Sequence, residues 1–69
     1  MLAYKIDVLK ALKEAGYNTT RLRKEKLISE SQIQSIRENS MIGIKTLDKI
    51  CFLLDSQPGE IIKFVSDNQ

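Results

Sequence analysis

Histidine is absent from this 69-residue chain, and cysteine occurs once, as Cys51. Without histidine and with a single thiol, the side-chain inventory excludes a structural zinc site and a histidine-based catalytic dyad. A lone cysteine also cannot form a disulfide within the chain. We interpret Cys51 as a small core residue rather than a redox switch, and we expect no bound metal and no cofactor.

Long apolar stretches are also missing, and the longest covers only residues 50–54. A membrane-spanning helix needs about 20 apolar residues, so no membrane association is expected. Charged residues interrupt the first ten positions, MLAYKIDVLK, which argues against a signal peptide. We therefore expect a cytoplasmic protein.

The length allows one domain, residues 1–69, with a small core. A chain of this size buries only about 60% of its unfolded surface, which leaves little volume for a deep cavity. Hydrophobic residues make up 42% and charged residues 29%, as in ordered soluble domains. The sequence has no nucleophile–base set and no glycine-rich phosphate loop, so we expect neither an enzyme nor a small-molecule substrate.

The net charge is +2, but positive charge gathers in one segment. Residues 21–26 carry four basic side chains against one acidic one, a local charge of +3, whereas residues 48–69 carry two against four, or −2. This asymmetry of charge indicates an anionic partner that binds in one orientation. A solvated helix face would produce the same basic cluster.

Apolar periodicity and capping signals predict five helices and no strands. Gly16 suits the left-handed position after the first helix, and Pro58 suits the first turn of the last one. Ser29 and Gln32 form an S-x-x-Q capping box before the third helix. The expected helices cover about residues 2–15, 19–26, 30–38, 44–54 and 58–65. The predicted fold class is all-α, because the alternation and turn signals of strands are weak.

The second and third expected helices have the spacing of a helix-turn-helix. Leu22 and Ile33 can meet between the two helices, while Ile28 fills the turn. The third helix has a narrow apolar stripe and short polar residues elsewhere, as a helix needs if it exchanges hydrogen bonds with base edges in the major groove. An ordinary solvated helix face has the same composition. The candidate base-reading residues are Glu30, Ser31, Gln34 and Ser35.

The chain resembles the phage-repressor-type (Cro/repressor-like) helix-turn-helix regulators, and in particular a small single-domain subgroup. The segments LRKEKLIS, IREN and TLDKICFLLDSQPGEII carry the resemblance. It covers about residues 6–65, and residues 46–62 are its most specific part. The resemblance implies a compact, five-helix, lambda-repressor-like domain that binds double-stranded DNA.

Carried over by position, the resemblance also implies contacts with the DNA backbone. The second helix would meet a phosphate at its start, helped by free backbone N–H groups. Gln34 would lie nearer the backbone than the other three base-reading candidates. The implied backbone contacts are Asn18, Thr19, Arg37, Asn39 and Lys45.

Two positions depart from the family pattern. Arg23 stands where a small alanine is usual, and we expect its stem to lie along the core edge. Leu27 stands where a glycine is usual, because the turn often needs positive φ. A leucine would be strained in that conformation, which predicts a longer or differently shaped turn.

The leading interpretation is a sequence-specific transcriptional regulator that represses by operator occupancy. The alternative is a protein–protein interaction module or an antitoxin-like component with the same fold, and salt-dependent binding to duplex DNA distinguishes the two. A homodimer would double the interface and read two half-sites. We expect a dimer face in the C-terminal half that uses Phe52 or Phe64 and their neighbours, because a core this small cannot bury every large apolar side chain.

Overall fold

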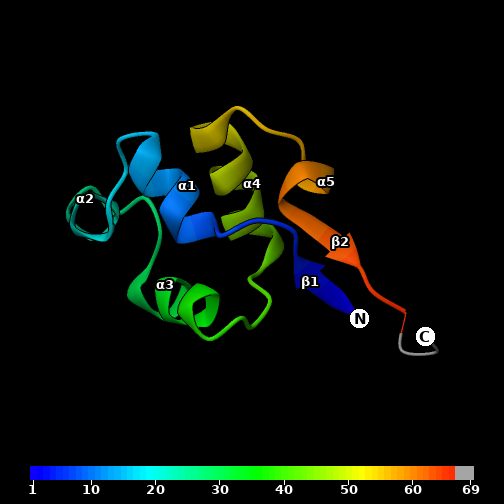
Figure 1. Cartoon of the computed structure of the whole chain (residues 1–69). Helices are drawn as coiled ribbons and strands as arrows, with labels where there is room; N and C mark the ends of the chain where they lie inside the picture. Colours follow the sequence, from blue (N-terminus) through cyan, green and yellow to red (C-terminus); the bar gives the residue numbers. More distant parts are fainter. Residues whose placement is uncertain (67–69) are drawn as a thin grey trace.

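The computed structural model describes residues 1–66 of the chain. Its elements are, in order, β1 (Leu2–Tyr4), α1 (Val8–Glu14), α2 (Thr19–Lys24), α3 (Glu30–Arg37), α4 (Ile44–Leu54), α5 (Pro58–Ile61) and β2 (Ile62–Phe64). The first helix packs against α3 and α4, and α4 packs against α5. Figure 1 shows the two strands as a ribbon that extends from one end of this group of helices.

The prediction of an all-α fold is wrong at both ends of the described chain. Residues 2–4 and 62–64, expected in the first and last helices, pair as antiparallel strands, with Leu2 opposite Phe64. The first helix begins only at Val8, because the Asp7 carboxylate accepts a hydrogen bond from the Lys10 N–H at 3.2 Å and Asp7 itself is extended. The two end segments then satisfy their backbone groups by bonding to each other.

Side-chain caps also start α2 and α3. The Asn18 side chain accepts from the Arg21 N–H at 2.8 Å, and the Ser29 hydroxyl accepts from the Gln32 N–H at 3.4 Å. The Gln32 side chain does not reach back to complete the expected capping box. Its Oε1 accepts from the Gly43 N–H at 3.1 Å, and this bond ties α3 to the start of α4.

The core combines residues from all five helices and from the connections between them. Leu22 and Ile33 are both fully buried, and Ile28 in the turn is 3% exposed, as the helix-turn-helix spacing predicts. The Tyr4 hydroxyl donates to the Ser40 carbonyl at 2.6 Å, which holds the ribbon beside the end of α3. The buried apolar residues are Val8, Leu12, Leu22, Ile28, Ile33, Ile36, Ile42, Ile50 and Ile61.

The turn between α2 and α3 places its left-handed residue at Lys26, with φ of 55°, and not at Leu27. The Lys26 N–H bonds to the Arg23 carbonyl at 3.1 Å, and the Leu27 N–H bonds to the Leu22 carbonyl at 2.9 Å. This is the Schellman pattern, in which Leu27 is the residue after the left-handed one. The strain expected at Leu27 therefore falls on Lys26.

Replacing Lys26 with glycine is expected to raise the free energy of unfolding by up to about 1 kcal/mol. The left-handed conformation costs an L-residue about 1–2 kcal/mol, and glycine's extra freedom in the unfolded chain offsets part of the gain. Urea unfolding followed by circular dichroism measures the change. Asn39→Gly is the matched control, because Asn39 also has positive φ (60°) but asparagine tolerates it better, so the gain is smaller. A lower stability for Lys26→Gly would contradict this turn.

Candidate nucleic-acid interface

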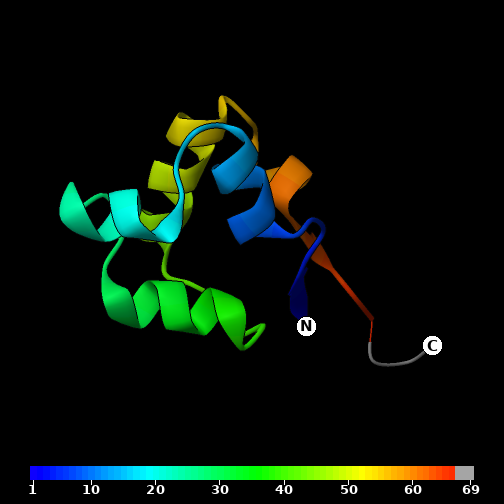
Figure 2. The same cartoon turned by 60° about the vertical axis from the view of Figure 1, so that its left-hand side comes forward.

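The α3 helix packs against the core through one narrow face, and most of its remaining surface is exposed to solvent. Its inward residues, Ile33 and Ile36, are 0% and 6% exposed. Figure 2 shows α3 along the lower side of the molecule, with no other helix beneath it. The remaining surface carries the candidate base-reading side chains, which are exposed at Glu30, Ser31 and Gln34 and half-buried at Ser35.

Several of these polar side chains bond along the helix. The Ser35 hydroxyl donates to the Ser31 carbonyl at 3.1 Å, and the Gln34 amide donates to the Glu38 carboxylate at 2.8 Å. The Ser31 hydroxyl lies 3.3 Å from the Ser29 hydroxyl. A solvent-exposed hydrogen bond contributes only about 1 kcal/mol net, so a base edge can replace such bonds at little cost.

Glu30 has a partner that sequence analysis missed. Arg23 of α2 donates from Nε to one oxygen of the Glu30 carboxylate and from Nη2 to the other, the second contact at 3.2 Å. Arg23 was expected along the core edge, but its guanidinium bridges α2 and the first residue of α3. The available signal was opposite charge on the two sides of the turn, and only the angle between the helices shows that the two side chains meet.

The candidate backbone contacts lie on three different elements. Asn18 caps α2 and Thr19 is its first residue, so the free N–H groups of that helix end lie beside them. Arg37, the last residue of α3, and Lys45, the second residue of α4, are both exposed. Asn39 is exposed and lies in the connection between these two helices. The structure thus groups Arg37, Asn39 and Lys45 around the α3–α4 connection, and Asn18 and Thr19 at a separate helix end.

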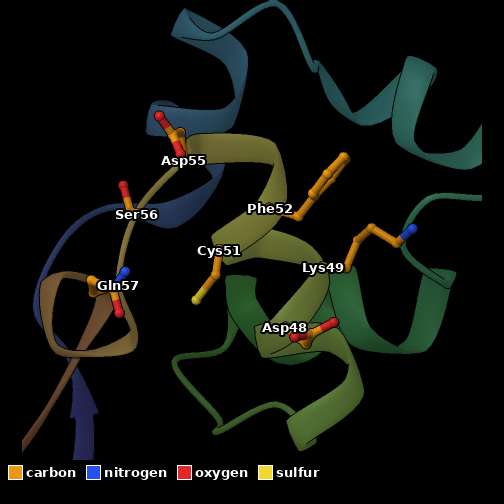
Figure 3. Close-up of a pocket in the computed structure, with 7 residues that line it drawn as sticks. All are labelled: Asp48, Lys49, Cys51, Phe52, Asp55, Ser56 and Gln57. Carbon is orange, nitrogen blue, oxygen red and sulfur yellow. The ribbon is translucent and has the colours of Figure 1, made fainter.

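A shallow hollow of about 490 Å³ lies on α4 and the turn after it (Figure 3). Its lining residues are Asp48, Lys49, Cys51, Phe52, Asp55, Ser56 and Gln57. Cys51 is half-buried and packs against the core, as expected for a small apolar residue. Desolvation, with a smaller contribution from Asp48, raises the pKa of the Cys51 thiol, so the thiol stays protonated at neutral pH. A protonated thiol is a poor nucleophile.

The two phenylalanines proposed for an interface are both solvent-exposed. Phe52 on α4 is 78% exposed, and Phe64 on β2 is 73% exposed. Figure 3 shows Phe52 directed away from the side of α4 that carries Cys51. Within residues 1–66, no three potential metal ligands among cysteine, aspartate and glutamate form a cluster. None of the helices in this part of the chain is long and apolar enough to cross a membrane.

Comparison with known proteins identifies the family of the chain. The family model of the Cro/C1-type HTH DNA-binding domain matches residues 7–67, nearly the full length of the chain. No curated protein and no solved structure shows significant similarity to this chain. The matched segment contains all five helices and the exposed surface of α3. The resemblance inferred from the sequence is confirmed, and the chain belongs to the family of Cro/C1-type helix-turn-helix DNA-binding domains.

Proposed function

We propose that the protein is a sequence-specific transcriptional regulator that represses by occupying an operator in double-stranded DNA. The observation that carries the proposal is the surface of α3, where two buried isoleucines hold the helix and the remaining side chains are polar. The major groove of DNA is about 12 Å wide and admits one α-helix. A helix held by one side of its surface can enter that groove with its polar residues directed at base edges.

The polar residues of α3 differ in what they offer to a base pair. Gln34 can exchange its bond to Glu38 for two bonds to adenine. Ser31 and Ser35 each carry a hydroxyl that can donate or accept, so they suit several bases. Glu30 is an acceptor only, and its complement in the major groove is the amino group of cytosine.

Backbone contacts would fix the orientation of α3 in the groove. The exposed cations Arg37 and Lys45 lie at the C-terminal end of α3 and at the start of α4, where phosphates would flank an inserted helix. Asn18 and Thr19 would bring the free N–H groups of α2 to another phosphate, and Asn39 would contribute its amide. Such contacts raise affinity for all sequences and carry no base preference.

We also propose a two-fold homodimer. Several exposed large apolar side chains lie on the β1–β2 ribbon, at Leu2 (50%) and Phe64 (73%), and on the residues that flank it, at Met1 (66%) and Val65 (38%). Leu2 and Phe64 are cross-strand partners, so their side chains share one face of the ribbon. A second group, Ile44 and Phe52, lies on α4. A dimer through the ribbon face that carries Leu2 and Phe64 would bury this pair and present two α3 helices to half-sites about 34 Å apart.

Selection of bound sites from random duplexes tests the proposed function directly. A repressor of this kind is expected to enrich one sequence with two half-sites related by inverted symmetry. Binding must also weaken steeply as salt concentration rises. If no sequence is enriched and binding is negligible at low salt, the protein–protein module or antitoxin-like component becomes the better explanation of the same fold.

Ser35→Ala is expected to change the preferred base at one position of each half-site, with several-fold loss of discrimination. The reason is that a hydroxyl facing a base contributes about 1 kcal/mol to choice of sequence. Ser56→Ala is a matched control, because the Ser56 hydroxyl also donates to a main-chain carbonyl at 3.1 Å, and Ser56 lies outside α3, in the connection between α4 and α5. Site selection measures preference, and thermal melting checks the fold. A uniform loss of affinity with an unchanged preferred site would exclude base reading by Ser35.

A further inference from the structure

The ion pair between Arg23 and Glu30 joins the two helices of the helix-turn-helix. Arg23 uses the edge of its guanidinium formed by Nε and Nη2, and each nitrogen contacts a different oxygen of the same carboxylate. A two-point contact between two planar groups restricts their relative orientation far more than one hydrogen bond does. The carboxylate is therefore held at the first turn of α3 by a residue of another helix.

The position of Glu30 would otherwise oppose DNA binding. Each strand of duplex DNA carries one negative charge per 3.4 Å along the helix axis. A free carboxylate at the start of a helix inserted into the groove is repelled by these phosphates. The guanidinium of Arg23 cancels the charge of Glu30, so the pair can approach DNA as a nearly neutral unit.

Glu30 keeps the capacity to bind a base while it is paired. A carboxylate has about four lone-pair sites, and Arg23 occupies two of them. The side chains of Arg23 and Glu30 are 43% and 61% exposed, so the pair lies at the surface and not in the core. The remaining acceptor sites suit the amino group of cytosine, which is the donor that cytosine presents in the major groove.

We propose that Arg23 is a positioning residue that orients and neutralises Glu30, so that Glu30 reads a cytosine at one position of each half-site. This inference rests on the proposed function, because it assigns a base preference to the same interface. The inference also gives different roles to two basic residues of α2: Arg21 pairs with Glu25, the residue that follows its own helix, whereas Arg23 acts across the turn.

The test is site selection with the unaltered protein and with Arg23→Ala, Arg23→Lys and Glu30→Gln. Exposed ion pairs contribute little to folding, so these variants are expected to fold. Arg23→Ala should lower the preference for cytosine at one position per half-site by about 10-fold, within the range of a specific base contact. Arg23→Lys should restore part of that preference because it returns the charge without the two-point geometry. Glu30→Gln in the Arg23→Ala background should cause little further loss.

Arg21→Ala is the matched control, since it removes a cation of the same helix whose ion pair also lies at the surface, and it should leave the cytosine preference unchanged. Equal affinity loss on all sequences with a shallower salt slope for Arg23→Ala would overturn the inference, because Arg23 would then be a phosphate contact. An unchanged preference in both Arg23→Ala and Glu30→Gln would overturn it as well. If the unaltered protein enriches no sequence, the proposed function itself fails, and that result is distinct from the other two.

Discussion

Alanine at both Arg37 and Lys45 is expected to weaken binding to every duplex by about 10- to 100-fold at physiological salt. Each phosphate contact releases condensed counterions, and loss of one lowers the slope of log affinity against log salt by about 0.9. The double variant should therefore have a slope shallower by nearly 2, while the preferred sequence stays the same. Titration of a selected duplex at several salt concentrations measures affinity and slope together.

The control for this variant keeps the charge at both positions. Arg37→Lys with Lys45→Arg exchanges the two cations, and a contact that acts through point charge should survive the exchange with nearly full affinity. Both residues are exposed in the free protein, so neither change should disturb the core. Full affinity and an unaltered salt slope in the double alanine variant would remove both residues from the interface.

Local signals were sufficient to predict α3. Ser29 is a strong N-cap residue, and the two isoleucines at helical spacing fix which side of α3 faces inward. The apolar stripe of α4 likewise needs no knowledge of distant residues. A helix with a capping residue, a periodic apolar stripe and a length of two or more turns can be predicted from its own local sequence.

The ribbon could not be predicted in the same way. Each strand has only three residues, too few to display alternation, and its partner lies at the other end of the chain. Leu2, Tyr4 and Ile6 lie among residues that also fit a helix. The helix predicted from apolar periodicity therefore began at residue 2, whereas α1 begins at Val8. The Asp7 cap was the one local sign of the boundary. Pairings between distant segments are decided by which backbone groups remain unsatisfied after the helices pack.

The candidate site shows the same division between local and non-local information. The polar surface of α3 follows from sequence, whereas the partner of Glu30 depends on the angle between α2 and α3. That angle is set by the turn, and the turn places its left-handed residue at Lys26 instead of Leu27. A shift of the left-handed position by one residue changes which side chains of α2 reach the start of α3. In this turn, the side chain that reaches Glu30 is Arg23.

Phe64→Asp is expected to give a folded monomer that binds its operator at least 100-fold more weakly. Phe64 is 73% exposed, so a charge there costs the free protein little. In the proposed dimer the same carboxylate would be buried against an apolar surface without a partner, which costs several kcal/mol. A monomer then loses the second half-site and the doubled interface that comes with it.

Sedimentation equilibrium measures whether Phe64→Asp is a monomer, and titration of full and half operators measures its loss of affinity. Phe52→Asp makes the same change at the other exposed phenylalanine, 78% exposed on α4, and is expected to leave the dimer intact. Dissociation by Phe52→Asp and not by Phe64→Asp would move the interface from the ribbon to α4. An unaltered protein that stays monomeric at high concentration, both free and on a full operator, would exclude the homodimer. In that case the ribbon's apolar face, which pairs Leu2 with Phe64, would need a different partner.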